Sequence, residues 1–99
     1  MNSPVNEICP LCAGPAEFIQ INLHRKHFKC QSCTEFVLWR NVEGHLARMA
    51  SSERQKFSAS AKATTNPNYI YVISSRLPKS PPHIDIEGRV LLRSEALAP

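Results

Sequence analysis

Hydrophobic and polar positions divide the chain into a β-rich front, a helical middle and a β-rich end. Apolar and polar side chains alternate through residues 18–23, which is typical of a strand with one buried face. The polar run at 24–27 predicts a hairpin turn, and Phe28 begins the return strand. Phe36 to Trp39 are four consecutive apolar residues, so we expect a strand covered on both faces, with Phe36 and Trp39 packed in the core.

An apolar stripe predicts helical structure over residues 41–62. Apolar side chains recur near multiples of 3.6, at positions 42, 46, 49, 57 and 61. Asn41 is a suitable N-cap, and Glu43 falls in the first turn, where the helix dipole favours an acid. Ser52 and Gln55 would form a capping box that restarts the helix. The pattern therefore allows either one bent helix or two short ones.

A strand pattern returns in the last third of the chain. Residues 69–73 are β-branched and aromatic, which favours a strand. Prolines in 77–83 predict an extended connector. Residues 84–92 predict two short strands around a hairpin turn at Glu87–Gly88, and the tail after Arg93 is expected to fray.

Four cysteines form the motif with the clearest chemistry. Cys9 and Cys12 make one Cys-x-x-Cys pair, and Cys30 and Cys33 make a second pair 17 residues further on. A tight turn aims both sulfurs of a pair at one ion, and a hairpin between the pairs completes a tetrahedron. We expect Gly14 to free the backbone as it leaves the first pair.

The spacing predicts one Zn²⁺ ion bound by Cys9, Cys12, Cys30 and Cys33. Its role is expected to be structural, because four cysteines fill the coordination sphere and leave no position for water or substrate. Iron on the same sulfurs is the main alternative. A redox disulfide at the first pair is disfavoured, because no βαβ pattern surrounds it.

These cysteines, with Phe18, Phe28 and Phe36 at apolar hairpin positions, resemble the zinc ribbon group over about residues 8–40. The resemblance implies a three-stranded antiparallel ribbon held by two cysteine turns. Such ribbons occur in transcription factors, polymerase subunits, ribosomal proteins, topoisomerase tails and interaction adaptors. The resemblance therefore predicts the site and does not select a function.

Together, the patterns predict an α+β protein. A zinc ribbon is expected over residues 6–40, a helix over 41–62 that packs on it, and a small β segment over 69–93. Residues 1–5 and 94–99 are expected to be flexible ends.

Charge adds a weaker indication of function. The 99 residues carry 12 Lys and Arg against 8 Asp and Glu, a formal net charge of +4. Four thiolates on a divalent ion would contribute a charge of about −2, which reduces this surplus. The only dense basic cluster lies at the predicted hairpin tip. We therefore predict nucleic-acid contacts, to DNA or RNA, by Arg25, Lys26 and Lys29, with Arg40 in support.

Two functions remain open at this stage, a nucleic-acid-binding accessory module and a protein-interaction adaptor with a purely structural zinc. A third, a subunit of an enzyme whose chemistry lies in another chain, is also open. The sequence shows no nucleophile elbow, paired catalytic carboxylates or phosphate loop, so neither catalysis nor a small-molecule substrate is expected. Apolar runs are too short for a membrane span, and the N-terminus lacks a basic, apolar leader. We expect a cytoplasmic protein with reduced cysteines.

Overall fold

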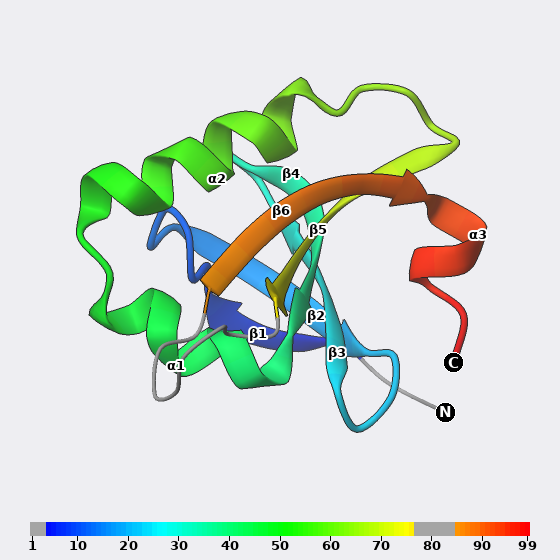
Figure 1. The fold of residues 1–99 in the computed structure, drawn as a ribbon, viewed down its shortest axis with the longest axis horizontal. Coiled ribbons are helices and arrows are strands. Elements are labelled where there is room, and N and C mark those ends of the chain that lie inside the picture. The colour runs from blue at the N-terminus through cyan, green and yellow to red at the C-terminus, as the bar shows by residue number, and fades with distance from the viewer. Residues whose placement is uncertain (1–3, 77–84) are drawn as a thin grey trace.

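A computed structural model of the chain describes residues 4–76 and 85–99 and shows an α+β fold, as predicted (Figure 1). Six strands form one mixed sheet in the order β1-β2-β3-β4-β5-β6. They are β1 (Val5–Ile8), β2 (Pro15–Gln20), β3 (Arg25–Cys30), β4 (Thr34–Trp39), β5 (Tyr69–Arg76) and β6 (Asp85–Leu92). The predicted ribbon and the predicted β segment are thus parts of one sheet. The connector predicted at 77–83 lies outside the described residues.

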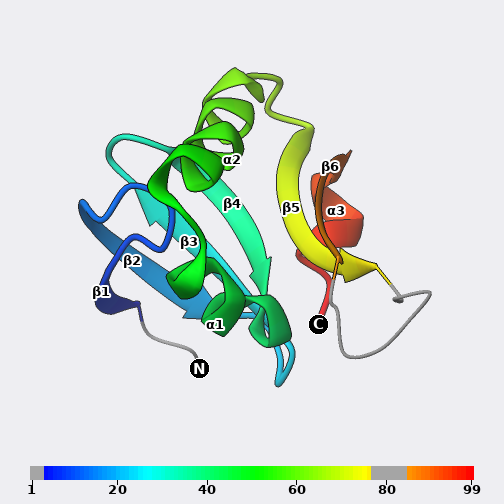
Figure 2. The ribbon, with the colours of Figure 1, turned by 60° about the vertical axis from the view of Figure 1, so that its left-hand side comes forward.

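A parallel pairing joins the two parts of the sheet. Strands β1 to β4 are antiparallel neighbours, β4 and β5 run parallel, and β6 returns antiparallel to β5. A parallel pair requires a crossover, which the helices α1 (Arg40–Arg48) and α2 (Ser51–Ala63) supply. Both helices cover the same face of the sheet (Figure 2).

The helical segment divides into two short helices rather than one bent helix. Met49 and Ala50 are extended, with ψ angles of 149° and 146°, and separate α1 from α2. The predicted caps are wrong, because neither helix has a side-chain cap. Asn41 lies inside α1, and its amide instead donates to Ser75 Oγ at 2.8 Å, which links the helix to β5.

The main core lies between the helices and the sheet. Phe18, Phe28 and Phe36 stand on neighbouring strands, with ring centroids of consecutive pairs 5.3 Å apart. Leu46 of α1 and Ala61 of α2 pack against this row. Burial of these apolar surfaces is the main contribution to the packing of helices on sheet.

A smaller core covers the opposite face of β4 and β5. Val37 packs there with Ile70 and Val72, under Ala96. Strand β4 is therefore covered on both faces, as predicted. Trp39 is an exception: it is the last residue of β4 and is 36% exposed, so its predicted place in the core is wrong.

The C-terminal end differs from the expected frayed tail. Arg93–Ala96 form a short helix, α3, in which Ala96 is buried. The Arg25 guanidinium donates to the Ala96 carbonyl at 2.6 Å and also to the Ala98 carbonyl. No local pattern predicts this attachment, because the two bonded residues are more than 70 positions apart in the chain.

Residues 85–92 form one continuous strand, so the predicted hairpin turn at Glu87–Gly88 is wrong. Gly88 pairs with Ile73 in the middle of the strand. A Cβ atom at position 88 would lie 1.7 Å from the Tyr71 hydroxyl oxygen. Glycine is required here for the close approach of the tyrosine side chain, not for a turn.

Candidate metal centre

The four predicted cysteines lie together at one end of the sheet. Their Sγ atoms are all within 4.8 Å of one another, with Cys9 and Cys33 3.8 Å apart and Cys12 and Cys30 3.4 Å apart. Four sulfurs around a tetrahedral zinc at about 2.3 Å would be about 3.8 Å apart. The cluster is consistent with binding one metal ion and suggests a zinc-binding module.

Strand pairing explains how distant cysteines meet. In the β2–β3 hairpin, Ala16 pairs with Cys30. This register places the β1–β2 turn, which carries Cys9 and Cys12, beside the β3–β4 turn, which carries Cys33. The 17 residues between the two pairs are the hairpin that brings them together.

Both cysteine turns have the same backbone conformation at the residue that follows the second cysteine. Ala13 has a φ of 62° and Thr34 a φ of 69°, and no other non-glycine residue in 4–76 or 85–99 is left-handed. This conformation disfavours side chains with a Cβ by roughly 1–2 kcal/mol. The role predicted for Gly14 is therefore wrong, since Ala13 makes the left-handed step. Gly14 instead accepts a hydrogen bond from the Cys9 amide at 2.8 Å.

The thiols differ in how readily they lose a proton. Burial would raise the pKa of Cys30, but the backbone amides of Cys33 and Ser32, with the neighbouring thiols, lower it to about 7. The Cys33 amide lies 3.4 Å from Cys30 Sγ. Burial raises the pKa of Cys9 and raises that of Cys33 to about 11. A cation must displace these protons, so metal affinity should fall as the pH is lowered.

Ser58 is a member of the site that the sequence analysis missed. It lies in α2, is 5% exposed, and its Oγ is 3.0 Å from Cys33 Sγ. Once Cys33 is a thiolate, only the hydroxyl has a proton to donate. Ser58 lies three positions before the buried Ala61 and therefore on the same face of the helix. A polar residue within the apolar stripe was the sequence feature that could have identified it.

Replacing Ser58 by alanine should weaken metal binding while the fold remains. Loss of a hydrogen bond to a ligand typically lowers metal affinity about 10-fold to 100-fold, and we expect the lower end. Competition with a chromogenic chelator measures this affinity. Ser52→Ala, at an exposed position of the same helix, is the matched control. Equal affinities for the two variants would contradict the role of Ser58.

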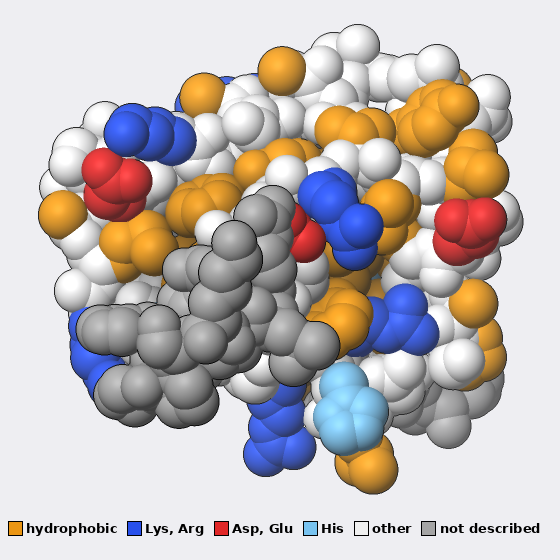
Figure 3. Space-filling view, viewed as in Figure 1, with side chains coloured by type: hydrophobic (Ala, Val, Ile, Leu, Met, Phe, Trp, Pro, Cys, Tyr) orange, Lys and Arg blue, Asp and Glu red, His pale blue; other side chains and the backbone are white. Residues whose placement is uncertain are grey.

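The predicted nucleic-acid residues do not form one surface. They lie in or after β3 rather than at a hairpin tip, and alternation places Lys26 on the opposite face from Arg25 and Lys29. Two of these cations already have partners within the protein. Arg25 donates hydrogen bonds to the C-terminal carbonyls, and Lys26 forms an ion pair with Glu43 at 2.9 Å. Lys29 and Arg40 remain exposed. Figure 3 likewise shows lysines and arginines scattered over one face rather than gathered.

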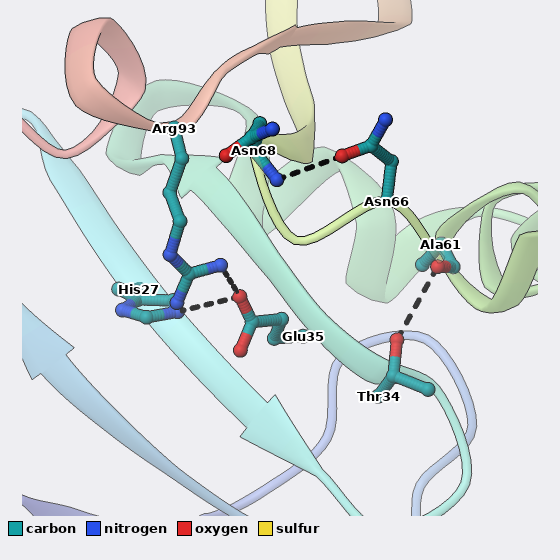
Figure 4. A network of polar contacts seen from close by, with 7 residues as sticks. All are labelled: His27, Thr34, Glu35, Ala61, Asn66, Asn68 and Arg93. Atoms are coloured by element: carbon teal, nitrogen blue, oxygen red, sulfur yellow. Dashed lines mark hydrogen bonds and ion pairs between the residues drawn. The ribbon is translucent and has the colours of Figure 1, made fainter. Parts of the chain in front are cut away.

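A second polar group lies on the sheet face opposite α1 and α2 (Figure 4). Arg93 forms an ion pair with Glu35, whose Oε1 is 3.8 Å from His27 Nε2. Burial lowers the pKa of His27. Burial would raise the pKa of Glu35, but the hydrogen bond and charge of Arg93 lower it.

Both shifts predict that acid destabilises the fold. The unfolded chain binds a proton at His27 more readily than the folded chain does, so stability falls as the pH drops through the ordinary histidine value of about 6.5. Stability contributed by Glu35 is lost at still lower pH. Urea unfolding at pH 7.5 and 6.0, in saturating zinc, should show a lower midpoint at pH 6.0. The decrease should be smaller in His27→Gln and unchanged in His24→Gln, which replaces an exposed histidine.

Comparison with known proteins yields no match: neither a family model, nor a curated protein, nor a solved structure aligns significantly with this chain. Among the described residues, no helix has the length and apolar character needed to cross a membrane.

Proposed function

We propose that Cys9, Cys12, Cys30 and Cys33 bind one structural Zn²⁺ ion in a zinc ribbon formed by β2, β3 and β4. The supporting observation is the clustering of four Sγ atoms within 4.8 Å of one another, three of them on buried cysteines. Zinc would supply no chemistry beyond holding the two cysteine turns together, since all four positions are protein ligands. We assign no catalytic step to the chain.

Metal analysis of the purified protein tests this assignment. One zinc per chain, with no visible absorption, is the expected result. One iron per chain with visible absorption would instead identify an iron–sulfur site. A folded protein without stoichiometric metal would contradict both.

We further propose that the protein is a nucleic-acid-binding accessory module. The observation that carries this proposal is a set of exposed cations with no ion pair among residues 4–76 and 85–99, including Lys29, Arg40 and Lys62. Unpaired cations on a protein with a positive net charge attract a polyanion and release its counterions on binding.

Fluorescence polarisation with labelled single-stranded and duplex DNA and RNA tests the second proposal. We expect binding at 50 mM salt that weakens steeply at 200 mM, because the attraction is electrostatic. A Lys29→Gln/Arg40→Gln double variant should bind more weakly and with a smaller salt slope. Absence of binding by the wild-type protein at 50 mM salt would reject the proposal.

One observation favours the alternative, a protein-interaction adaptor. Strand β1 is an edge strand whose four residues are all exposed, including Val5 at 50% and Ile8 at 69%. Such an edge can accept an extended peptide as an added strand. Asn6→Pro would remove a backbone donor from this edge. Loss of peptide binding in this variant, together with no nucleic-acid binding by the wild type, would favour the adaptor.

A further inference from the structure

Tyr69 stands where three surface hollows meet. It is the first residue of β5 and is 39% exposed. The first hollow, of about 450 Å³, lies between the end of α2 and β6. The second, of about 520 Å³, lies between the end of α2 and Arg93. The third, of about 650 Å³, lies beside Leu97. The α2–β5 loop and α3, which border them, lie together at the right of Figure 1.

Cations outnumber acids around this tyrosine. Lys62, Arg89 and Arg93 line the three hollows, and Glu35 is the only acidic residue that does so among those whose side chains the structure describes. Arg93 forms an ion pair with Glu35, and Arg89 is 3.6 Å from Glu87, whereas Lys62 has no ion pair within the described part of the chain. The rest of the lining includes neutral side chains that can form hydrogen bonds, namely those of Thr64, Thr65, Asn66 and Ser94. The surface is thus complementary in charge to an anion and rich in donors.

The loop before Tyr69 is held in one conformation. The Tyr69 amide donates to the Asn66 carbonyl at 3.1 Å, and the Asn66 side chain accepts from the Asn68 amide at 2.9 Å. The Arg93 amide donates to the Asn68 carbonyl at 2.9 Å, which fixes the loop against the start of α3. Figure 4 shows the contact between Asn66 and Asn68. A preorganised surface loses less conformational entropy when it binds.

We infer that Tyr69 is a stacking platform for a base of single-stranded nucleic acid, with Lys62 and Arg89 placed to contact the flanking phosphates. An exposed aromatic ring beside cations is the arrangement that binds single strands, because an unpaired base offers its face for stacking. A duplex encloses its base faces and would meet only the cations. The inference rests on the proposed nucleic-acid function and specifies its site and ligand, which differ from the residues predicted from the sequence.

Polarisation titrations of the zinc-loaded protein with labelled 12-nucleotide single strands test the site. Tyr69→Leu removes the ring and keeps an apolar residue, and should weaken binding by about fivefold or more. Tyr69→Phe keeps the ring and should bind like the wild type. Lys62→Gln should lower affinity and the salt slope. Lys56→Gln is the matched control, because Lys56 is exposed on the same helix and is paired with Glu53.

The outcomes separate the site from the function. Wild-type binding that is unchanged in Tyr69→Leu and Lys62→Gln would overturn the site and leave the nucleic-acid function intact. Tighter binding to a 12-base-pair duplex than to the single strand would overturn the stacking role. Absence of any binding by the wild type at 50 mM salt would remove the function and this inference together. Circular dichroism of each variant verifies that the fold is retained.

Discussion

A Cys30→Ser variant is expected to lose stoichiometric zinc and the folded structure of the ribbon. Cys30 is buried at the end of β3, and its thiol pKa is lowered to about 7. Structural zinc contributes roughly 10–16 kcal/mol in small zinc modules, as much as or more than the roughly 5–15 kcal/mol stability of a whole domain.

Circular dichroism, metal analysis and urea unfolding measure this loss. Ser32→Ala is the matched control, because it changes an exposed side chain in the same turn and keeps the backbone amides that lie near Cys30. It should remain folded with one zinc per chain. A Cys30→Ser protein that is metal-free, yet unfolds at the wild-type urea midpoint, would show that the metal does not hold the fold.

Gly88→Ala is expected to destabilise the protein by about 3 kcal/mol, the upper end of the usual range for overpacking. The added Cβ would lie 1.7 Å from the Tyr71 hydroxyl oxygen and 2.2 Å from its ring carbon Cζ. Tyr71 is buried in the main core, so a shift of its ring would disturb the packing there. Thermal and urea unfolding in saturating zinc report the change in the free energy of unfolding.

Gly44→Ala serves as the matched control for this substitution. Gly44 lies in α1, and a Cβ there would meet no atom within 4 Å. The same change should therefore stabilise the protein by about 0.5–1 kcal/mol, because alanine favours a helix. In a Tyr71→Leu background, which lacks the clashing atoms, Gly88→Ala should destabilise much less. An equal effect in both backgrounds would show that Tyr71 is not the cause.

Local patterns predicted the elements well where one period extended over several residues. The stripe over 41–62 gave helices and the aromatic run at 69–73 gave a strand, whereas the alternation at 18–23 located β2 but not its end, which is at Gln20. Misassignments occurred where one residue type serves two purposes. Gly88 suggested a turn, but glycine also permits close packing within a strand. Trp39 suggested a core residue, but it ends its strand at the start of α1.

The amino-acid sequence alone determined which four cysteines form the candidate metal centre, because two Cys-x-x-Cys pairs need only a hairpin between them to bring their sulfurs together. Only the tertiary structure decided which charges stay free. Arg25 and Lys26 are neighbours in sequence, yet strand alternation sends one to the C-terminal carbonyls and the other to Glu43. The contact of Ser58 with Cys33 is decided by the packing of α2 on the sheet, and that of Tyr71 with Gly88 by the antiparallel pairing of β5 with β6. These pairings join residues far apart in the chain, and such contacts leave no periodic trace in sequence.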